Sequence, residues 1–169
     1  ESVLAFSKIE RGSARSEVAD TELNSLLESF VERFSSRLDS AGLRLDFKPG
    51  SPVNVKLDAS ALEHILFNLI DNAAKYASSS VPPVVSMETK IRNGDVAISI
   101  SDHGPGITGA ECRRIFRPFH KSAKQAAETK PGVGLGLALS KRLARSIGGS
   151  LDCHARADGT SGAVFTLKL

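Results

Sequence analysis

The stretch LEHILFNLIDNAAKY, residues 62–76, has the apolar spacing of an amphipathic helix that buries one face. On a helical wheel with about 100° per residue and Leu62 at zero, its apolar residues fall in one arc from about 300° to 80°. Asn68, Asn72 and Lys75 fall at about 240°, 280° and 220°, along one flank of that arc. A polar stripe in this position is expected to be half-buried, so it can line a cleft beside the core.

The two asparagines need an explanation, because asparagine is a poor helix former whose amide competes for backbone hydrogen bonds. One interpretation is a binding site, since amide oxygens suit a hard cation such as Mg²⁺ and a lysine suits a phosphate. The other interpretation is a surface helix with two incidental asparagines. This segment alone does not decide between them.

Composition indicates one ordinary globular domain. The 169 residues are 41% hydrophobic and 24% charged, which is enough for one full core and too little for two domains. We expect a soluble piece, because no apolar run reaches membrane length and no signal peptide is present. Cys112 and Cys153 lack paired spacing, which argues against a disulfide framework or zinc site and favours inert thiols in a reducing compartment. The four histidines show no ligand spacing, so metal catalysis through histidine is not expected.

Positive charge gathers between residues 113 and 145, although the net charge of the chain is only +3. Glu128 is the sole acidic residue of this region. Such a region suits nucleic acid, an acidic partner or a polyphosphate. Nucleic-acid recognition usually adds interleaved aromatics or a recognition helix, and this region offers only Phe116 and Phe119, so polyphosphate is favoured. The basic residues are Arg113, Arg114, Arg117, Lys121, Lys124, Lys130, Lys141, Arg142 and Arg145.

Apolar periodicity and turn residues divide the rest of the chain into helices, strands and loops. Residues 1–12 are predicted to be the end of a helix, and residues 13–20 a linker. Asn93-Gly94 predicts a tight hairpin, because both residue types tolerate positive φ. The main predicted helices are 21–41, 58–76 and 137–147, and the predicted strands are 43–47, 53–58, 84–91, 96–101, 150–156 and 163–169.

Asp102 follows the predicted strand 96–101 in register with its inward apolar face. A carboxylate buried there without a partner would cost several kcal/mol. Gly104 and Gly106 remove side chains where another group could approach the backbone, and Pro105 stiffens the turn between them. These residues predict a pocket wall in which Asp102 accepts a hydrogen bond from a ligand amino group. An ordinary tight turn without a ligand has the same residues.

A glycine-rich segment opens the last predicted helix. Residues 108–131 are predicted to form a mobile loop, which ends in Gly132, Gly134 and Gly136. Such a loop points backbone N–H groups and the helix dipole at an anion. A polar loop rather than a strand precedes it, so it is not a dinucleotide-binding fingerprint, and it lacks the Gly-Lys-Ser/Thr ending of a P-loop.

Four motifs together resemble a known family. NLIDNAAKY, DHGPGI, FRPF and GVGLGL occur in this order between residues 64 and 137. The ordered set resembles the catalytic, ATP-binding domain of bacterial sensor histidine kinases, within the superfamily that includes gyrase, Hsp90 and MutL. FSKIERG and the polar linker after it resemble the end of the second dimerisation helix.

The resemblance implies an α/β two-layer sandwich of about three helices on a mixed five-stranded sheet. Residues 1–12 would end the dimerisation helix, 13–20 would be the linker, and 21–169 the catalytic domain with a flexible lid at about 108–131. The implied cofactors are ATP and Mg²⁺.

The resemblance also implies roles for particular residues. Asn68 and Asn72 would hold Mg²⁺ and through it the phosphates, and Asn68 and Lys75 would be the catalytic residues. Asp102 would bind the adenine amino group. Phe116 and Phe119 would anchor the lid, although packing in the core explains them equally well. The implied ATP-binding residues are Asn68, Asn72, Lys75, Tyr76, Asp102, Gly104, Gly106, Ile107, Phe119, Lys121, Lys124, Gly132, Val133, Gly134, Leu135, Gly136 and Leu137.

The position of Asn68 favours a kinase over an ATPase. In the gyrase and Hsp90 branch, a glutamate one turn before the second asparagine activates water, and here that position is Asn68. Glu63 falls at about 100° on the wheel, opposite Asn72, so it does not replace that base. We therefore expect slow hydrolysis and transfer of the γ-phosphoryl group to a protein histidine. A gyrase- or MutL-type ATPase and a nucleotide-binding regulatory module are the alternatives.

The resemblance places the phosphoacceptor histidine on a separate dimerisation domain. In the family, the acceptor histidine lies on a dimerisation helix, with an acidic residue beside it and a proline a few residues on. None of the four histidines here has that setting, so we expect this fragment to bind ATP without autophosphorylating. We expect a monomeric fragment of a homodimeric protein that serves a response-regulator receiver domain. It would be a cytoplasmic domain of a protein that can be anchored in the inner membrane.

Overall fold

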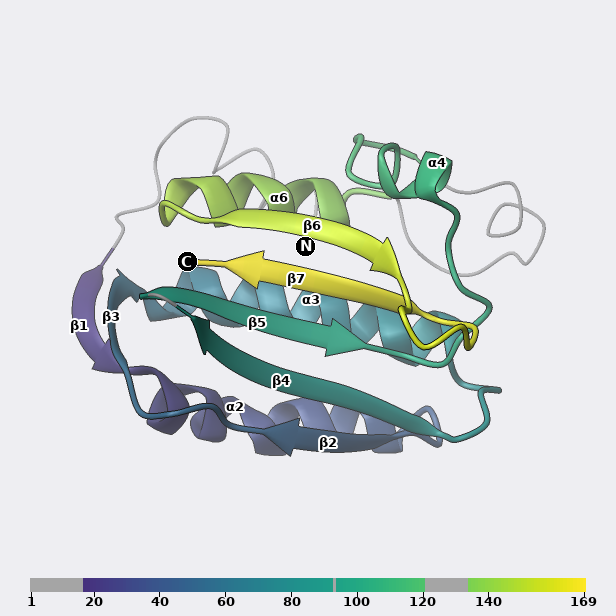
Figure 1. Ribbon diagram of the computed structural model, residues 1–169, viewed down its shortest axis with the longest axis horizontal. Helices are drawn as coiled ribbons and strands as arrows, with labels where there is room; N and C mark the ends of the chain where they lie inside the picture. The colour runs from purple at the N-terminus through teal and green to yellow at the C-terminus, as the bar shows by residue number, and fades with distance from the viewer. Residues whose placement is uncertain (1–16, 93, 121–133) are drawn as a thin grey trace.

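The computed structural model describes residues 17–92, 94–120 and 134–169. Its centre is a mixed sheet of five strands in the order β2-β4-β5-β7-β6 (Figure 1). β2 runs parallel to β4, and the other neighbouring pairs are antiparallel. The strands are β2 (Arg44–Lys48), β4 (Val84–Arg92), β5 (Asp95–Ser101), β6 (Ser150–Ala155) and β7 (Ala163–Lys168).

Helices form a second layer against one face of this sheet (Figure 1). α3 (Ala59–Tyr76) packs between α2 (Leu23–Asp39) and α6 (Gly136–Ser146). The short α4 (Gly109–Cys112) packs beside β6. The arrangement confirms the predicted two-layer sandwich with a mixed five-stranded sheet.

The core confirms the predicted inward faces of α3 and β5. Burying one large aliphatic side chain stabilises a fold by about 1.5–3 kcal/mol, so these faces fix how α3 lies on the sheet. The register of α3 in turn decides where its polar flank points. The buried residues are Leu62, Ile65, Leu66, Leu69 and Ile70 on α3, and Val96, Ile98 and Ile100 on β5.

The segment before α2 differs from the prediction. Residues 18–20 were expected in a linker and residue 21 in a helix, but Val18–Glu22 forms a strand, β1, that pairs antiparallel with β3 (Asn54–Asp58). The helix begins at Leu23 because the Glu22 carboxylate accepts hydrogen bonds from the N–H groups of Asn24 (3.1 Å) and Ser25 (2.8 Å). The sequence of residues 18–22 shows no clear strand pattern of its own, so pairing with β3 determines that it forms a strand.

Two expected segments lie wholly or partly outside the described residues. These are the end of a helix over residues 1–12, with the first part of the linker, and the second half of the loop 108–131. In the described part of the chain, no helix is both long and apolar enough to cross a membrane.

Candidate functional site

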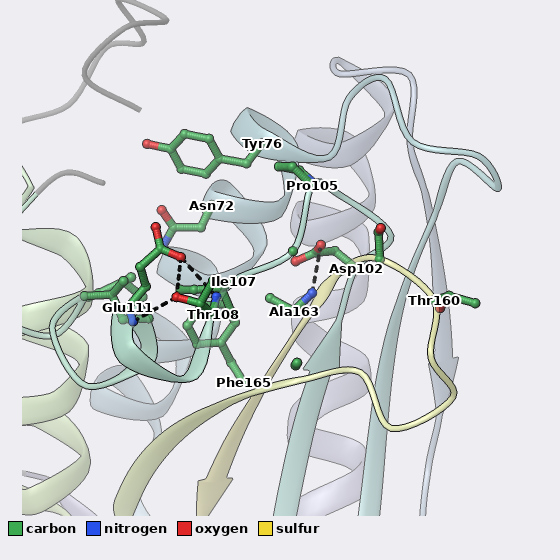
Figure 2. Close-up of a pocket in the computed structure, with 16 residues that line it drawn as sticks. Asn72, Tyr76, Asp102, Pro105, Ile107, Thr108, Glu111, Thr160, Ala163 and Phe165 are labelled. Carbon is green, nitrogen blue, oxygen red and sulfur yellow. Dashed lines mark hydrogen bonds between the residues drawn. The ribbon is translucent and has the colours of Figure 1, made fainter. Parts of the chain in front are cut away.

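A cavity of about 470 Å³ lies at the end of β5, between the last turns of α3, the loop leading into α4, and the turn that joins β6 to β7 (Figure 2). Apolar side chains and several polar groups share its wall, as is usual for small-molecule sites. The lining residues are Asn72, Tyr76, Asp102, Pro105, Gly106, Ile107, Thr108, Glu111, Ile115, Leu137, Ala155, Thr160, Ser161, Gly162, Ala163 and Phe165.

Asp102 presents one carboxylate oxygen to this cavity. Its Oδ1 accepts hydrogen bonds from the backbone N–H groups of Gly104 (2.8 Å) and Ala163 (3.3 Å). Within the described residues, no hydrogen bond occupies Oδ2. Burial raises the pKa of Asp102, although the two N–H groups and the nearby Arg156 oppose this rise. With Oδ1 held in this way, Oδ2 is left as an available hydrogen-bond acceptor in the cavity wall.

The two glycines after Asp102 make room mainly for the protein's own backbone. A Cβ on Gly104 would lie 3.0 Å from Asp102 Oδ1 and 3.1 Å from the Tyr76 carbonyl oxygen. Gly106 has a φ of +78°, and a Cβ there would lie 3.2 Å from the Gly162 nitrogen. Gly106 lines the cavity, whereas Gly104 supports the Asp102 carboxylate from behind.

The two α3 asparagines both use their amide nitrogens in protein hydrogen bonds. Asn68 Nδ2 donates to the buried Ser140 hydroxyl (3.1 Å) and to the Gly136 carbonyl oxygen (3.4 Å). Asn72 Nδ2 donates to the Asn68 carbonyl oxygen (2.9 Å). Among the described residues, neither side-chain oxygen receives a hydrogen bond. Two amide oxygens one helical turn apart fit a hard cation such as Mg²⁺, so the residues present suit the implied metal.

Lys75 points to a neighbouring ion pair instead of the cavity. Its Nζ lies 2.5 Å from Asp71 Oδ2, while Asp71 Oδ1 accepts a hydrogen bond from Arg37 Nε of α2 (2.8 Å). Lys75 and Asp71 are each about a quarter exposed, at 27% and 25%. Lys75 is therefore held by Asp71 in this structure, and contact with a ligand at the cavity would require it to leave that partner.

The glycine-rich segment is described from Gly134 onward. Gly134 has a φ of +74° and accepts a hydrogen bond from the Phe119 N–H (3.0 Å). α6 begins at Gly136, and its N-cap residue Leu135 makes no side-chain hydrogen bond to the helix. Within the described residues, no side chain caps the first N–H groups of α6, which is the arrangement that suits an anion. Leu135 is buried and Leu137 lines the cavity. The remaining predicted residues of this region, Lys121, Lys124, Gly132 and Val133, lie outside the described residues.

The two phenylalanines of the FRPF motif differ in surroundings. Phe116 is half-buried, and its ring meets that of Phe165 edge-on with centroids 6.4 Å apart. Phe119 is 69% exposed and has a φ of +60°. Phe116 therefore packs against the core, as the core interpretation predicted, whereas that interpretation is wrong for Phe119. Phe119 has an unfavourable left-handed backbone conformation although its ring is exposed.

The turn between β6 and β7 was missed as part of the site. Arg156 donates to the Asp102 carbonyl oxygen (3.3 Å) and, through Nε, to the Thr160 hydroxyl (2.8 Å). Hydrogen bonds from Arg156 and Thr160 also hold the pKa of Asp158 well below its usual range. At Gly162, with φ +139°, a Cβ would lie 2.0 Å from the Asp102 carbonyl oxygen, so only glycine lets the turn close on the loop after β5.

The start of α4 also lines the cavity, and the sequence contains a pattern that could have identified it. Thr108 and Glu111 form a capping box, in which the Glu111 N–H donates to the Thr108 hydroxyl (3.2 Å) and the Thr108 N–H donates to the Glu111 carboxylate (3.0 Å). The spacing Thr-x-x-Glu is readable in the sequence and predicts the start of α4. No local sequence pattern could show that the β6–β7 turn belongs to the site, because the turn reaches Asp102 only through the order of the strands in the sheet.

Comparison with known proteins gives one family. A family model described as histidine kinase-, DNA gyrase B- and HSP90-like ATPase matches residues 57–169. The Non-motile and phage-resistance protein of Caulobacter vibrioides is 31% identical over 169 residues, which cover 99% of this chain and 20% of that protein. The Signal transduction histidine-protein kinase BarA of Escherichia coli is 29% identical over 171 residues, covering 99% and 19%. The chain thus spans about a fifth of the length of these relatives.

Solved structures show the same fold. The structure of full-length ShkA in complex with AMPPNP matches with a TM-score of 0.81 and 27% identity, over 99% of this chain and 34% of that one. The Mycobacterial sensor histidine kinase MprB matches with a TM-score of 0.70 and 28% identity, over 90% of this chain and 96% of that one.

Proposed function

The chain belongs to the histidine kinase-, DNA gyrase B- and HSP90-like ATPase family, and we propose that it binds Mg²⁺-ATP and donates the γ-phosphoryl group to a histidine in two-component signalling. The observation that carries the proposal is the free Oδ2 of Asp102 in the wall of a cavity that Asn72 also lines. A carboxylate acceptor suits the amino group of adenine, and the amide oxygen suits the cation of a nucleotide. The ShkA complex with AMPPNP supports this assignment.

The cavity residues divide between base and phosphates. Asp102 accepts the adenine amino group, and Ile107 and Leu137 pack on the purine and ribose together with Tyr76. Gly106, which lines the cavity, lets the β6–β7 turn pack against this part of the wall. Toward the phosphates, Gly134 and the uncapped start of α6 at Gly136 offer backbone N–H groups, with Leu135 buried beneath them. Lys121, Lys124, Gly132, Val133 and Phe119 keep the phosphate-contact or lid roles that the family resemblance implies.

Asn68 and Asn72 would hold Mg²⁺ through their side-chain oxygens, and Lys75 would leave Asp71 to contact a phosphate. Bound Mg²⁺ neutralises phosphate charge, and the chain's own residues position the triphosphate. The absence of an acid at position 68 favours transfer over hydrolysis. Glu63 is also unsuited to activate water, because it forms an ion pair with Arg33 of α2.

The acceptor and partners follow from the same proposal. The acceptor is a histidine on the protein's own dimerisation domain. Residues 1–12 would end that domain, and the residues between them and β1 would link it to the catalytic domain. The full-length homodimer then passes the phosphoryl group to a response-regulator receiver domain. We place this chain in the cytoplasm, in a protein that can be anchored in the inner membrane.

Labelled ATP tests the transfer. We expect the chain, incubated with γ-labelled Mg²⁺-ATP, to remain unlabelled and to hydrolyse ATP far more slowly than once per minute. Adding the dimerisation domain of the same protein should give an acid-labile, histidine-linked label on that domain. Steady-state hydrolysis at several turnovers per minute would support a gyrase- or MutL-type ATPase instead. Tight binding without transfer to the dimerisation domain would support a regulatory module.

The raised pKa of Asp102 predicts how nucleotide affinity depends on pH. The adenine amino group donates to the ionised carboxylate, so binding favours the charged form, and affinity falls as the pH falls through the pKa of Asp102. Because burial raises this pKa, the loss begins at a higher pH than an ordinary aspartate would give. Protonation relieves the buried charge and so adds folding stability as the pH falls, which separates this effect from acid unfolding.

The measurement is the dissociation constant of ADP from neutral to mildly acidic pH, in wild type and in Asp102→Asn. Subtracting the variant's profile removes protonation of the nucleotide itself. An identical pH dependence in both proteins would contradict the role given to Asp102.

A further inference from the structure

The two cysteines of the chain lie in contact, although 41 positions separate them. Cys112 ends α4 and Cys153 lies in β6. Their Sγ atoms are 3.0 Å apart, with the Cys112 thiol donating to the Cys153 sulfur. The spacing of the two cysteines in the sequence, which favours inert thiols, does not predict this contact.

A second cavity, of about 420 Å³, gives small molecules access to this pair. The two cysteines are only 9% and 7% exposed, so a protein partner could not reach them easily. Both nevertheless line the cavity, along with the cationic Arg113 and Lys141.

α4 lies between this second cavity and the cavity at the end of β5, here called the nucleotide cavity. Its residues Thr108 and Glu111 line the nucleotide cavity, while Gly109 and Cys112 line the cavity of the thiol pair. Ala155, two residues after Cys153 on the same strand, lines both cavities. A covalent link between α4 and β6 would therefore fix a wall that the two cavities share.

We propose that Cys112 and Cys153 are a modification site, at which a small peroxide oxidises the pair to a reversible intramolecular disulfide. The Cys112 thiolate attacks a peroxide oxygen, the O–O bond breaks, and Cys112 becomes a sulfenic acid with release of hydroxide or alkoxide. The Cys153 sulfur then attacks the Cys112 sulfur, forming the S–S bond and releasing water. With hydrogen peroxide, two thiols and one peroxide give one disulfide and two waters.

Cys153 is assigned the second step because of its surroundings. Burial, together with its contact with Cys112, raises the pKa of the Cys153 thiol. Bond formation brings the sulfurs from 3.0 Å to about 2.05 Å, so they must approach by about 1 Å. Such a movement is small enough for the short α4 and its flanking loop. The proposed oxidation does not require nucleotide binding, so its test is independent of the test of the proposed function.

The test uses the whole chain and hydrogen peroxide as the probe. After oxidation, alkylation of free thiols and digestion without reductant, mass spectrometry should find the peptides of Cys112 and Cys153 linked, in a monomer, with two hydrogen atoms lost. Dithiothreitol should restore both thiols. Because the chain has only two cysteines, no other pairing within one molecule competes.

Two further readouts separate a disulfide from simple oxidation. The oxidised wild type should unfold at a higher temperature than the reduced wild type, and amide exchange in residues 109–117 should slow by at least about threefold. Cys112→Ala and Cys153→Ala should show neither difference between peroxide-treated and untreated samples. Thiols that stay unmodified, a sulfinic acid on one cysteine without a link, or dimers linked between chains would each overturn the proposal.

Discussion

Asp102→Asn is expected to weaken ATP and ADP binding by at least about 100-fold without lowering the melting temperature. The asparagine Oδ1 can still accept the N–H groups of Gly104 and Ala163, so the loop keeps its shape. In the variant, however, the asparagine Nδ2 takes the place of the free Oδ2. A hydrogen-bond acceptor is thereby replaced by a donor, which would face the amino group of adenine, also a donor. Hydrogen bonds to charged groups contribute about 1.5–3 kcal/mol, and two opposed donors add a further penalty.

Stability should not fall in this variant. Burial raises the pKa of Asp102, which means that the ionised carboxylate is less favourable in the folded chain than in the unfolded one. A neutral amide removes that cost. The measurements are calorimetric titration with ADP and a thermal melt.

Asp95→Asn is the matched control, because Asp95 is an exposed aspartate at the other end of β5. It should bind nucleotide like the wild type. If Asp102→Asn binds ADP as tightly as Asp95→Asn does, Asp102 does not bind the adenine, and the cavity has another ligand.

Asn72→Ala is the second large effect, and it should depend on the metal. The variant removes one of the two amide oxygens proposed to hold Mg²⁺, so Mg²⁺-ATP affinity should fall by at least about tenfold. With the metal chelated, wild type and variant should agree within about threefold, because the base contacts of Asp102 are unchanged. Alanine is the better helix former, so α3 should remain folded.

Asn54→Ala serves as the control, since Asn54 is an exposed asparagine at the start of β3. Its Mg²⁺-ATP affinity should match the wild type. An Asn72→Ala variant that loses the same affinity with and without Mg²⁺ would show that Asn72 acts on the nucleotide directly and not through a cation.

The fold was predictable where the local pattern and the tertiary structure agree. The 3.6-residue period of 62–76 predicted the inward face of α3, and alternation along 96–101 predicted both the buried face of β5 and the inward position of Asp102. Asn93-Gly94 predicted the hairpin, whose partner strands pair up to Arg92 and Asp95. These features depend on neighbours within a few residues.

The features that were missed depend on distant segments. β1 forms because β3 supplies its partner, and the β6–β7 turn meets Asp102 only because β7 pairs with β5. Lys75 lies on Asp71 rather than at the cavity, and Arg37 of the neighbouring α2 holds the other oxygen of that carboxylate. Helix periodicity placed Lys75 on the polar flank of α3 but predicted neither its ion-pair partner nor its position outside the cavity wall.

The most direct test of the central claim is calorimetric titration of the wild-type chain with Mg²⁺-ATP and with ADP. We expect both to bind with one nucleotide per chain and with dissociation constants between the micromolar and the millimolar range. Asp102→Asn should weaken the binding of both nucleotides by at least about 100-fold, and Asn72→Ala should weaken mainly that of Mg²⁺-ATP. If the wild-type chain binds neither nucleotide across that range, the proposed ATP site is contradicted.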